Sequence, residues 1–553
     1  MTVIDGERTR SEPDVIAQTR DLLRIARTLY ASDRAALAGL DAMQTRLDEP
    51  LRVAVAGMVK AGKSTLLNAL LGERIAATDA GECTRVVTWY RYAQTPSISM
   101  HLRDGRTERM QIRRDHGRLV LDLGGRVAEE IDWIDVGWPL GGLESQILID
   151  TPGIASLSHG VSARTAQFLA PEQSASSADA VVYLMRHLHG SDIHFLEAFR
   201  DTAAGAAQSV CAVGVLSRAD EVGSGRIDSL MSARRVARRY ERDGELASLA
   251  LGVIPMAGLL AEGARTLRES EFIALRDLAG RERTDRERLL VSADRFVRPD
   301  ADTDLSVGVR QDLLARFGLF GVRLAAAVIR GGVADSSSLS AALAEQSGLH
   351  QLEEFIARQF IPRAPALKVR GVMMQLQALV SERPCEGEER IRAGIERFFA
   401  SAHTLRELSL LALARTGALP LPEAEADDAI RIIGGDGTTA ALRLGMAEGA
   451  SQGEIRIRVQ QESIRWRSLA ADPTAAPDTA EIRRCVVRSL AGIASEIGGA
   501  RDLRPAPDVV PSGGPGHGAG EDAEQESQQH QRGLRRKNRL HDLSLRSQRD
   551  PFR

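Results

Sequence analysis

The sequence is poor in aromatic residues and in cysteine. Aromatic side chains make up 4% of the 553 residues, so the hydrophobic cores must consist mainly of Leu, Ala, Val and Ile, a composition that favours helices. The four cysteines are far apart, and no two of them form a C-x-x-C pair. This spacing fits a reducing compartment and excludes a disulfide framework or a zinc site made of cysteines.

Long hydrophobic runs and excess charge are also absent. No apolar run approaches the roughly 18 residues of a membrane-spanning helix, and the first residues lack the apolar segment of a signal peptide. We therefore expect a cytoplasmic protein whose contact with a membrane, if it makes one, is peripheral. The net charge of −3 argues against a dedicated nucleic-acid binder. The chain is too long for one core, so about two to four domains are expected.

A phosphate-binding loop is the clearest motif. The apolar run Val53–Ala56 ends in Gly57, and Gly62, Lys63 and Ser64 then open a segment of strong helix formers. This order of strand, loop and helix fits the pattern G-x-x-x-x-G-K-[ST] without a mismatch. The glycines let backbone N–H groups surround a phosphate at the N-terminus of the helix. Lys63 would reach the β- and γ-phosphates, and the Ser64 hydroxyl would ligate Mg²⁺.

Further buried strands follow the loop, and helical patterns separate them. They predict a doubly wound, mainly parallel sheet whose loops gather at one edge. Residues 96–140 alternate apolar and polar positions around turn signals, which is typical of hairpin strands. The expected core strands after the loop are Val86–Tyr90, Gln146–Asp150, Ala178–Leu184, Val210–Leu216 and Gly252–Met256.

Two of these strands end in polar motifs. At the end of the strand Gln146–Asp150, the motif Asp150-Thr-Pro-Gly153 places a carboxylate that can hold Mg²⁺ through water and an N–H that can sense a γ-phosphate. After the strand Val210–Leu216, Ser217-Arg218-Ala-Asp220 stands where a guanine-specificity motif [NT]-K-x-D belongs. Asp220 can accept hydrogen bonds from guanine, while Arg218 lies along the base. Ser217 departs from the pattern and weakens the hydrogen bonds that tie the loop. The tetrad is alternatively an ordinary cap between a strand and a helix.

Thr84 and Lys60 are two further candidate residues near the loop. Thr84 is the candidate for a switch threonine that completes the Mg²⁺ shell. No glutamine follows Gly153, so a water-orienting group is missing from its usual place. We therefore hypothesise that the Lys60 ammonium replaces a monovalent cation against the phosphates. The alternative is a solvent-facing lysine.

The remaining sequence predicts helices. The helical pattern at 14–47 breaks near Ser32, and its apolar stripes must pack on distant helices. Residues 408–422 are either a tip that enters lipid or a buried helix end. From Arg504 the composition indicates a disordered tail, and its basic end is either a contact for anionic lipid or a solvated terminus. After residue 262, helices are expected at 270–296, 308–330, 338–360, 366–381, 387–412 and across 452–498.

At this point the chain resembles the bacterial dynamin-like GTPases. It is most similar to the actinobacterial isoniazid-inducible group, and within it to the smaller of two members. The resemblance covers roughly residues 14–500. The motifs that carry it are the loop at 57–70, Asp150–Gly153, Leu216–Gly223 and Ala315–Arg323.

The resemblance implies an α/β P-loop GTPase head on a helical trunk. It divides the chain into N-terminal trunk helices (1–50), a GTPase domain (51–362), a helical trunk (363–503) and a basic tail (504–553). It also implies hydrolysis of GTP to GDP and phosphate, with GTP and Mg²⁺ as ligands. The site residues carried over are Gly57, Lys60, Ala61, Gly62, Lys63, Ser64 and Thr65 for phosphate, Ser64, Thr84 and Asp150 for Mg²⁺, Gly153 beside the γ-phosphate, and Ser217, Arg218 and Asp220 for guanine.

The resemblance further implies head-to-head dimerisation that depends on nucleotide, and pairing with a dynamin-like homologue. It implies remodelling of an anionic membrane at the inner face of the cell, in envelope maintenance or drug stress. Two other classes stay open. One is a soluble GTP switch whose helical part binds proteins and never lipid, and the other is an ATP-dependent P-loop enzyme.

Overall fold

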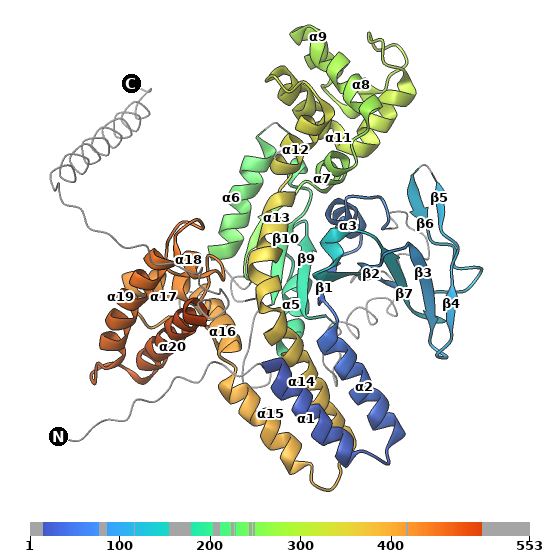
Figure 1. The fold of residues 1–553 in the computed structure, drawn as a ribbon. Helices are drawn as coiled ribbons and strands as arrows, with labels where there is room; N and C mark the ends of the chain where they lie inside the picture. Colours follow the sequence, from blue (N-terminus) through green and yellow to red (C-terminus); the bar gives the residue numbers. More distant parts are fainter. Residues whose placement is uncertain are drawn as a thin grey trace, which may run out of the picture. The chain divides into compact units, whose positions relative to one another are not determined.

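One large β-sheet organises the molecule and carries the predicted phosphate loop at a strand end (Figure 1). The structure is a computed structural model that describes residues 15–76, 86–115, 117–153, 178–202, 211–222, 226, 228–242, 246, 249–415 and 419–499. The strands are β1 (Leu51–Gly57), β2 (Val87–Tyr92), β3 (Ser97–Leu102), β4 (Thr107–Arg109), β5 (Arg113–Asp115), β6 (Arg118–Val120), β7 (Ile131–Trp138), β8 (Gln146–Asp150), β9 (Ala180–Met185), β10 (Ala212–Leu216) and β11 (Val253–Pro255).

Half of this sheet is parallel, as the sequence predicts. Among the described residues the strand order is β11-β10-β9-β1-β8-β2-β7-β3-β4, and β11, β10, β9, β1 and β8 all run in the same direction. In β1, Val55 lies opposite Asp150 of β8 and Val182 of β9. The carboxyl ends of these strands therefore meet at one edge, where a doubly wound fold binds its ligands.

The other half is mixed. β2 runs antiparallel to β8, β7 runs parallel to β2, and β3 pairs antiparallel with both β7 and β4. Alternate positions of β3 are buried, which is the period-two pattern of a sheet with one solvated face. β5 and β6 form a separate hairpin. These strands confirm the expectation of hairpins in residues 96–140.

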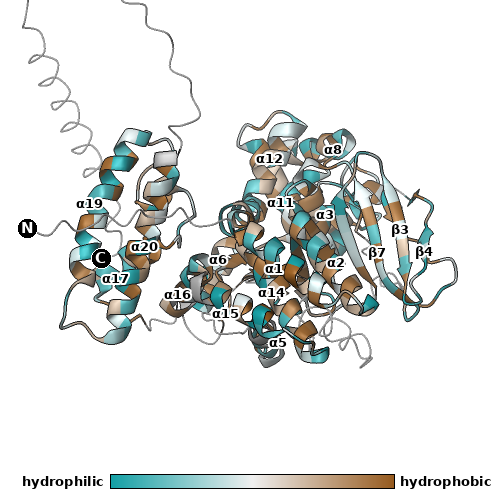
Figure 2. Cartoon of the chain, turned by 60° about the horizontal axis from the view of Figure 1, so that its bottom comes forward, coloured by the Kyte–Doolittle hydropathy of each residue, from teal (hydrophilic) through white to brown (hydrophobic). Residues whose placement is uncertain are grey.

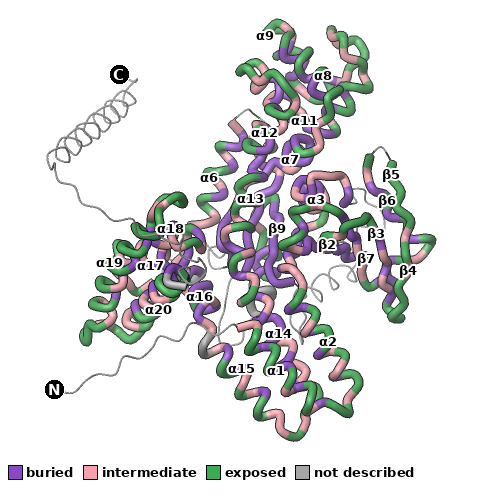
Figure 3. The backbone as a smooth tube through the Cα atoms, in the orientation of Figure 1, coloured by how far each residue is buried: buried purple, intermediate pink, exposed green. Residues whose placement is uncertain are grey.

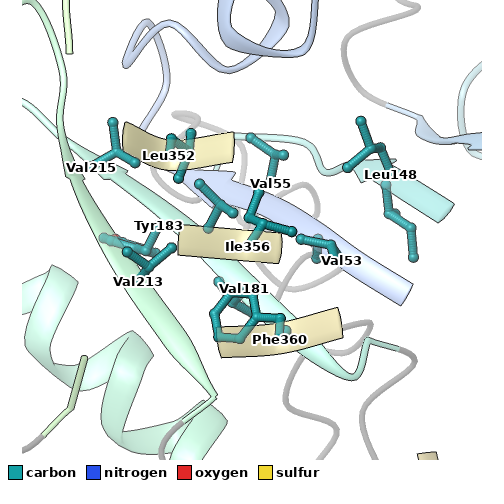
Figure 4. Close-up of a cluster of buried hydrophobic side chains, with 14 of the residues drawn as sticks. Val53, Val55, Leu148, Val181, Tyr183, Val213, Val215, Leu352, Ile356 and Phe360 are labelled. Atoms are coloured by element: carbon teal, nitrogen blue, oxygen red, sulfur yellow. The ribbon is translucent and has the colours of Figure 1, made fainter. Parts of the chain in front are cut away.

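Helices cover the parallel half. β9 and β10 are buried at every position, because helices lie on both faces of such sheets. Figure 4 shows side chains of β1, β8, β9 and β10 packed against Leu352 of α13 (Leu349–Phe355) and against Ile356 and Phe360 of the π-helix η5 (Ile356–Phe360). The other helices between β1 and α13 are α3 (Lys63–Leu71), α5 (Gly190–Thr202), α6 (Ser229–Arg242), α7 (Gly258–Arg265), α8 (Glu269–Gly280), α9 (Arg283–Leu289), α10 (Ala293–Phe296), α11 (Val307–Arg330) and α12 (Ser336–Gln346), of which α8 and α9 lie away from the sheet (Figure 1).

The N-terminal hairpin packs on helices more than 300 residues later. It consists of α1 (Val15–Leu29) and α2 (Arg34–Asp48), and it contacts α14 (Ala364–Glu382) and α15 (Glu389–Ser401). Asp33 caps α2 by accepting hydrogen bonds from the N–H groups of Ala35 and Ala36. It also forms an ion pair with Arg383 at 2.9 Å. The predicted break near Ser32 and the predicted distant partner are both confirmed.

A buried ion pair joins this hairpin to the sheet. Arg46 of α2 contacts Asp179 at 2.8 Å, and both side chains are almost fully buried. Asp179 directly precedes β9 and also accepts a hydrogen bond from the Arg52 N–H at 2.9 Å. Lys368 of α14 donates to the Leu47 carbonyl at the end of α2 at 2.8 Å. Breaking one such buried charge pair generally costs about 3–5 kcal/mol, so these contacts tie α2, α14 and the sheet together.

Three predicted helices are interrupted in the structure. The segment expected as one helix at 270–296 consists of α8, α9 and α10, and the segment expected at 338–360 consists of α12, α13 and η5, with left-handed Gly348 between the first two. The helix expected at 387–412 breaks at Ala402, whose ψ of 85° is not helical, and α16 (His403–Arg415) follows. Two helices were not predicted, namely α17 (Glu423–Ile432) and α18 (Ala440–Arg443). The expected helical region at 452–498 forms α19 (Gln452–Ala470) and α20 (Pro477–Gly499).

The apolar segment at 408–422 contains the end of α16, which is buried on one side. Leu408 and Leu411 are 1% and 4% exposed, because α16 packs on α20, α17 and α14, whereas Leu413 is 40% exposed. No helix in the described part of the chain is long and apolar enough to span a bilayer. The tail after residue 504 lies outside the described residues.

Candidate functional site

The predicted phosphate loop connects β1 to α3 with an unusual backbone. Gly57, Lys60 and Gly62 have φ angles of 145°, 64° and 99°. A Cβ on Gly57 would lie less than 3.0 Å from the Leu184 carbonyl of β9, so only glycine allows the neighbouring strand to come this close. Lys60 adopts a left-handed conformation that costs a non-glycine residue about 1 kcal/mol or more. Such strain is frequent in loops that surround a ligand.

The Lys63 side chain is folded back over this loop. Its ammonium donates to the carbonyls of Gly57 at 3.1 Å and Met58 at 3.3 Å. Burial lowers the pKa of Lys63, while the nearby Asp150 carboxylate favours the charged form. The first N–H groups of α3 have no partner within the helix and face the same space. A cation and a helix N-terminus at one point form a site for an anion such as phosphate.

Two oxygen-bearing side chains meet beside the lysine. The Ser64 hydroxyl donates to Asp150 Oδ2 at 3.2 Å, because β8 ends next to β1 and brings Asp150 to the start of α3. Burial raises the pKa of Asp150 to about 6, although Lys63 and Ser64 oppose this shift. A hydroxyl and a carboxylate are hard oxygen donors of the kind that Mg²⁺ prefers, so these residues fit that ion.

Gly153 lies directly against the phosphate loop. A Cβ at this position would be 2.9 Å from the Cα atom of Val59 and 3.1 Å from its nitrogen. Thr151 fixes the approach, because its hydroxyl donates to the Val55 carbonyl at 2.9 Å. The structure thus brings the D-x-x-G motif to the loop, as its position after β8 predicts.

The Ser217–Asp220 tetrad forms one wall of a cavity next to the loop. The cavity has a volume of about 190 Å³. Burial raises the pKa of Asp220, which indicates a carboxylate held in a partly dry place. The cavity is lined by Ala61, Gly62, Thr65, Leu66, Leu184, Val215, Ser217, Arg218, Asp220, Glu221, Met256, Gly258 and Leu259.

Arg218 and Ser217 have specific contacts within this wall. Arg218 has a left-handed backbone and donates to the Lys60 carbonyl at 3.3 Å and to Glu221 at 2.8 Å. Its guanidinium therefore links the tetrad to the phosphate loop. The Ser217 hydroxyl donates to the Met185 carbonyl at 3.2 Å. This hydrogen bond joins the ends of β10 and β9, so Ser217 supplies one tie for this loop.

Two other predicted site residues are less constrained. The Lys60 side chain is exposed, so its backbone is fixed while its ammonium is free to reach toward a ligand. Thr84 lies outside the described residues. The structure therefore assembles all the predicted residues except Thr84 around one edge of the sheet.

Sequence reasoning missed the third wall of the cavity. Met256, Gly258 and Leu259 follow β11 and also line the pocket. The Met256 carbonyl accepts a hydrogen bond from the Ala219 N–H at 3.0 Å, which joins this segment to the tetrad. The sequence does contain a signal for this wall. It predicts a strand at Gly252–Met256, and ligands bind at the carboxyl ends of such strands.

Comparisons with known proteins agree with this geometry. A model of the Dynamin family matches residues 53–197. The isoniazid-induced protein IniC of Mycobacterium tuberculosis is 42% identical over 462 residues, which cover 84% of this chain and 93% of that protein. IniA of the same species is 33% identical over 174 residues, covering 27% and 26% of the two chains.

Two more distant similarities extend the comparison. A bacterial dynamin-like protein of Nostoc punctiforme is 30% identical over 114 residues, covering 19% of this chain and 16% of that protein. One solved structure is of an oligomerised bacterial dynamin pair that provides a mechanism for long-range sensing and tethering of membranes. It matches 90% of this chain and 77% of its own, with 13% identity and a TM-score of 0.32.

Proposed function

The chain is a GTPase of the dynamin family, similar over most of its length to the isoniazid-induced protein IniC, and from this premise we propose that it couples Mg²⁺-dependent GTP hydrolysis to dimerisation and membrane remodelling. The observation that carries the proposal is the meeting of three groups at the start of α3. Lys63 covers the loop, Ser64 contacts Asp150, and the cavity that contains Asp220 opens beside them.

Each part of the nucleotide has residues suited to it. The loop from Gly57 to Thr65 would bind the phosphates, and Lys63 would exchange its carbonyl partners for phosphate oxygens. Ser64 and Asp150 would hold Mg²⁺, which supplies charge neutralisation between the phosphates, and Thr84 would join them. The Gly153 N–H would lie at the γ-phosphate. Lys60 would add positive charge from the exposed side of the loop.

Asp220 and Arg218 would select the base. The size of the cavity suits a planar ring, with the Asp220 carboxylate accepting from guanine N1–H and N2–H₂. Replacing Asp220 by Asn removes this acceptor pair and provides a donor for the oxygen at C2 of xanthine. We expect Asp220→Asn to lower kcat/KM for GTP roughly a hundredfold or more and to raise that for xanthosine triphosphate.

The measurement is nucleotide hydrolysis with GTP, ATP and xanthosine triphosphate. The matched control is Glu221→Gln, which removes the adjacent carboxylate from the same wall and should keep GTP as the preferred substrate. Equal use of ATP and GTP by the wild type, unchanged in Asp220→Asn, would instead establish an ATP-dependent enzyme.

The division of the chain into head and trunk is also part of the proposal. The head would comprise residues 51–362, and α1 and α2 within residues 1–50 would join the trunk at 363–503, with a basic tail at 504–553. The contacts of α1 and α2 with α14 and α15 support this grouping. Arg46, Asp179 and Lys368 then lie where the head meets the trunk, at the ends of strands opposite the phosphate loop. A structural change in the phosphate loop would be transmitted to the trunk through β1 and β9.

The proposed location is the inner face of the cell membrane, with a head-to-head dimer or a dynamin-like homologue as partner. A second candidate is a soluble GTP switch whose helical part binds other proteins. The burial of Leu408 and Leu411 favours that candidate, because it supports the second of the two alternatives for residues 408–422, a buried helix end. The choice between the two therefore depends on whether another surface suits a membrane.

A further inference from the structure

The α19 helix carries two exposed isoleucines on one line. Ile457 is 60% exposed and Ile464 is 65% exposed. They are seven residues apart, which is almost two full turns of a helix. On the opposite side Ile455, Val459 and Trp466 are buried, where the helix packs on α20. The isoleucine line therefore lies on the side of α19 opposite its contact with α20, and Figure 3 shows exposed stretches along this helix.

Arginines flank the isoleucine line on both sides. At about 100° per residue, Arg456 and Arg467 lie along one side of the line, and Arg458 and Arg465 lie along the other. All four residues are exposed. The helix is otherwise mostly hydrophilic (Figure 2). A membrane interface accommodates both features, because isoleucine side chains can enter the boundary of the acyl chains while arginines contact headgroup phosphates.

The two arginine rows differ in their partners. Arg458 forms an ion pair with Glu462 at 2.9 Å, and Arg465 with Asp428 at 2.6 Å. In the described part of the chain, Arg456 and Arg467 have no acidic partner. Their guanidinium groups are therefore available for an anion outside the molecule, and arginine suits phosphate because of its fixed fork of donors.

The charge of this face distinguishes between three possible binding partners, namely a second copy of α19, a nucleic acid and an anionic bilayer. A second copy of α19 would place its own arginines against these, and like charges in contact are unfavourable. A nucleic acid would use the arginines but would gain nothing from two exposed isoleucines, since the sequence-independent part of such binding is electrostatic. A bilayer with anionic headgroups uses both features, because phosphate lies next to hydrocarbon at its surface.

We propose that the outer face of α19, defined by Arg456, Ile457, Ile464 and Arg467, is the surface by which this protein lies on an anionic lipid membrane. The two isoleucines enter the boundary between headgroups and acyl chains, and the arginines contact lipid phosphates. This inference rests on the proposed membrane function and replaces the segment at 408–422 as the lipid-contacting element.

The test is flotation of the full chain with vesicles in a density gradient. Vesicles of phosphatidylcholine with phosphatidylglycerol are compared with vesicles of phosphatidylcholine alone, with and without a non-hydrolysable GTP analogue. The variant Ile457→Gln/Ile464→Gln should bind the anionic vesicles roughly tenfold or more weakly than the wild type. Its GTP turnover without vesicles should be unchanged, because both side chains are exposed and distant in sequence from the loop.

Two matched controls separate this surface from general stickiness and charge. Val291→Gln removes another apolar side chain, which is 62% exposed in the connection between α9 and α10, and should leave binding unchanged. Arg456→Gln/Arg467→Gln should weaken binding more than Arg234→Gln/Arg238→Gln, which removes the same charge from exposed positions of α6. Equal loss in the two arginine pairs would overturn the assignment to α19.

Other outcomes are equally decisive. Wild-type flotation that the isoleucine variant retains in full would overturn this inference and leave the proposed membrane function standing. Absence of wild-type flotation under every condition would remove both. A change in sedimentation of the isoleucine variant without vesicles would identify a second copy as the occupant. Binding of duplex DNA that depends on Arg456 and Arg467, with unchanged flotation, would identify a nucleic acid.

Discussion

At the residue scale, the chemistry of the site could be read from the sequence because it resides in contiguous motifs. The loop from Gly57 to Ser64 fixes its own geometry, and Asp150 needed only the end of a buried strand to reach Ser64. The approach of Gly153 to Val59, and the link from Arg218 to the Lys60 carbonyl, could not be read in the same way. They depend on the lateral order of the strands, which no local pattern encodes.

The closeness of Gly153 to the phosphate loop predicts a specific sensitivity. In Gly153→Ala the new methyl group would lie less than 3.0 Å from the Val59 side chain and 2.9 Å from its Cα atom. Overpacking of this kind costs typically about 1–3 kcal/mol, and here it must displace the loop. We expect affinity for GTP to fall roughly tenfold, measured by titration with a fluorescent GTP analogue. Gly142→Ala, where nothing lies within 4 Å, is the control. Equal affinity in both variants would contradict the expectation.

The role of Lys60 can be separated into its ammonium and its backbone. Lys60→Gly and Lys60→Ala both remove the ammonium, but glycine adopts the φ of 64° without strain. If the ammonium stands in for a monovalent cation, both variants should lose about tenfold or more in kcat. Lys60→Arg should retain more activity. Wild-type turnover should also be similar in potassium, sodium and choline chloride. A strong dependence on potassium or sodium, or a loss in the alanine variant alone, would reject this role.

At the element scale, long periodic helices were predicted and their interruptions were not. The hairpin at 14–47 was recognisable because its apolar stripes repeat at helical spacing. The break at Ala402 has no Pro or Gly to announce it. It follows from tertiary contacts, since His403 turns inward to contact Ser489 of α20 at 2.9 Å. The same burial explains the correction at Leu408, because an apolar run looks alike whether it faces lipid or a neighbouring helix.

The contact between α16 and α20 contains a buried carboxylic acid, Glu407, whose protonation state affects the stability of the fold. Burial by itself would raise the pKa of Glu407, but His403, Arg443 and Ser489 outweigh it and hold the pKa below the usual 4.5. The group therefore contributes stability above the unfolded pKa and loses it as the pH falls through the folded pKa. We expect Glu407→Gln to lower the free energy of unfolding by about 3–5 kcal/mol at pH 7. The difference should shrink below about pH 4.5.

The measurement is urea unfolding followed by circular dichroism between pH 3.5 and 7, values chosen to bracket roughly the ordinary carboxyl pKa. The control is Glu448→Gln, which removes a surface partner of Arg358 at 2.8 Å and should cost about 1 kcal/mol or less. A difference between Glu407→Gln and the wild type that stays constant with pH would show that the stabilisation does not come from the charge of Glu407.

At the scale of the whole molecule, the sequence predicted the fold class and the order of head and helical parts. It did so because a P-loop followed by alternating strands and helices admits few topologies. The sequence did not predict the mixed half of the sheet, in which β2 runs antiparallel to β8. The pairing of α2 with the start of β9 through Arg46 and Asp179 was also unpredictable, because these residues are 133 positions apart.

The missing glutamine after Gly153 leads to the last prediction. The residues that follow are Ile154-Ala-Ser-Leu, so the glutamine that orients an attacking water in other GTPases is absent from its usual place. The exposed loop around Lys60 leaves the catalytic edge accessible to a second head, which can supply the missing group or order the first head. GTP turnover per molecule should therefore rise steeply with protein concentration, and the apparent affinity for GTP should rise with it, because dimerisation that depends on nucleotide strengthens nucleotide binding in turn. Measuring phosphate release over a dilution series, with inert protein added to keep total protein constant, tests this. A flat dependence would place the complete catalytic machinery within one chain and remove the dimer from the proposed function.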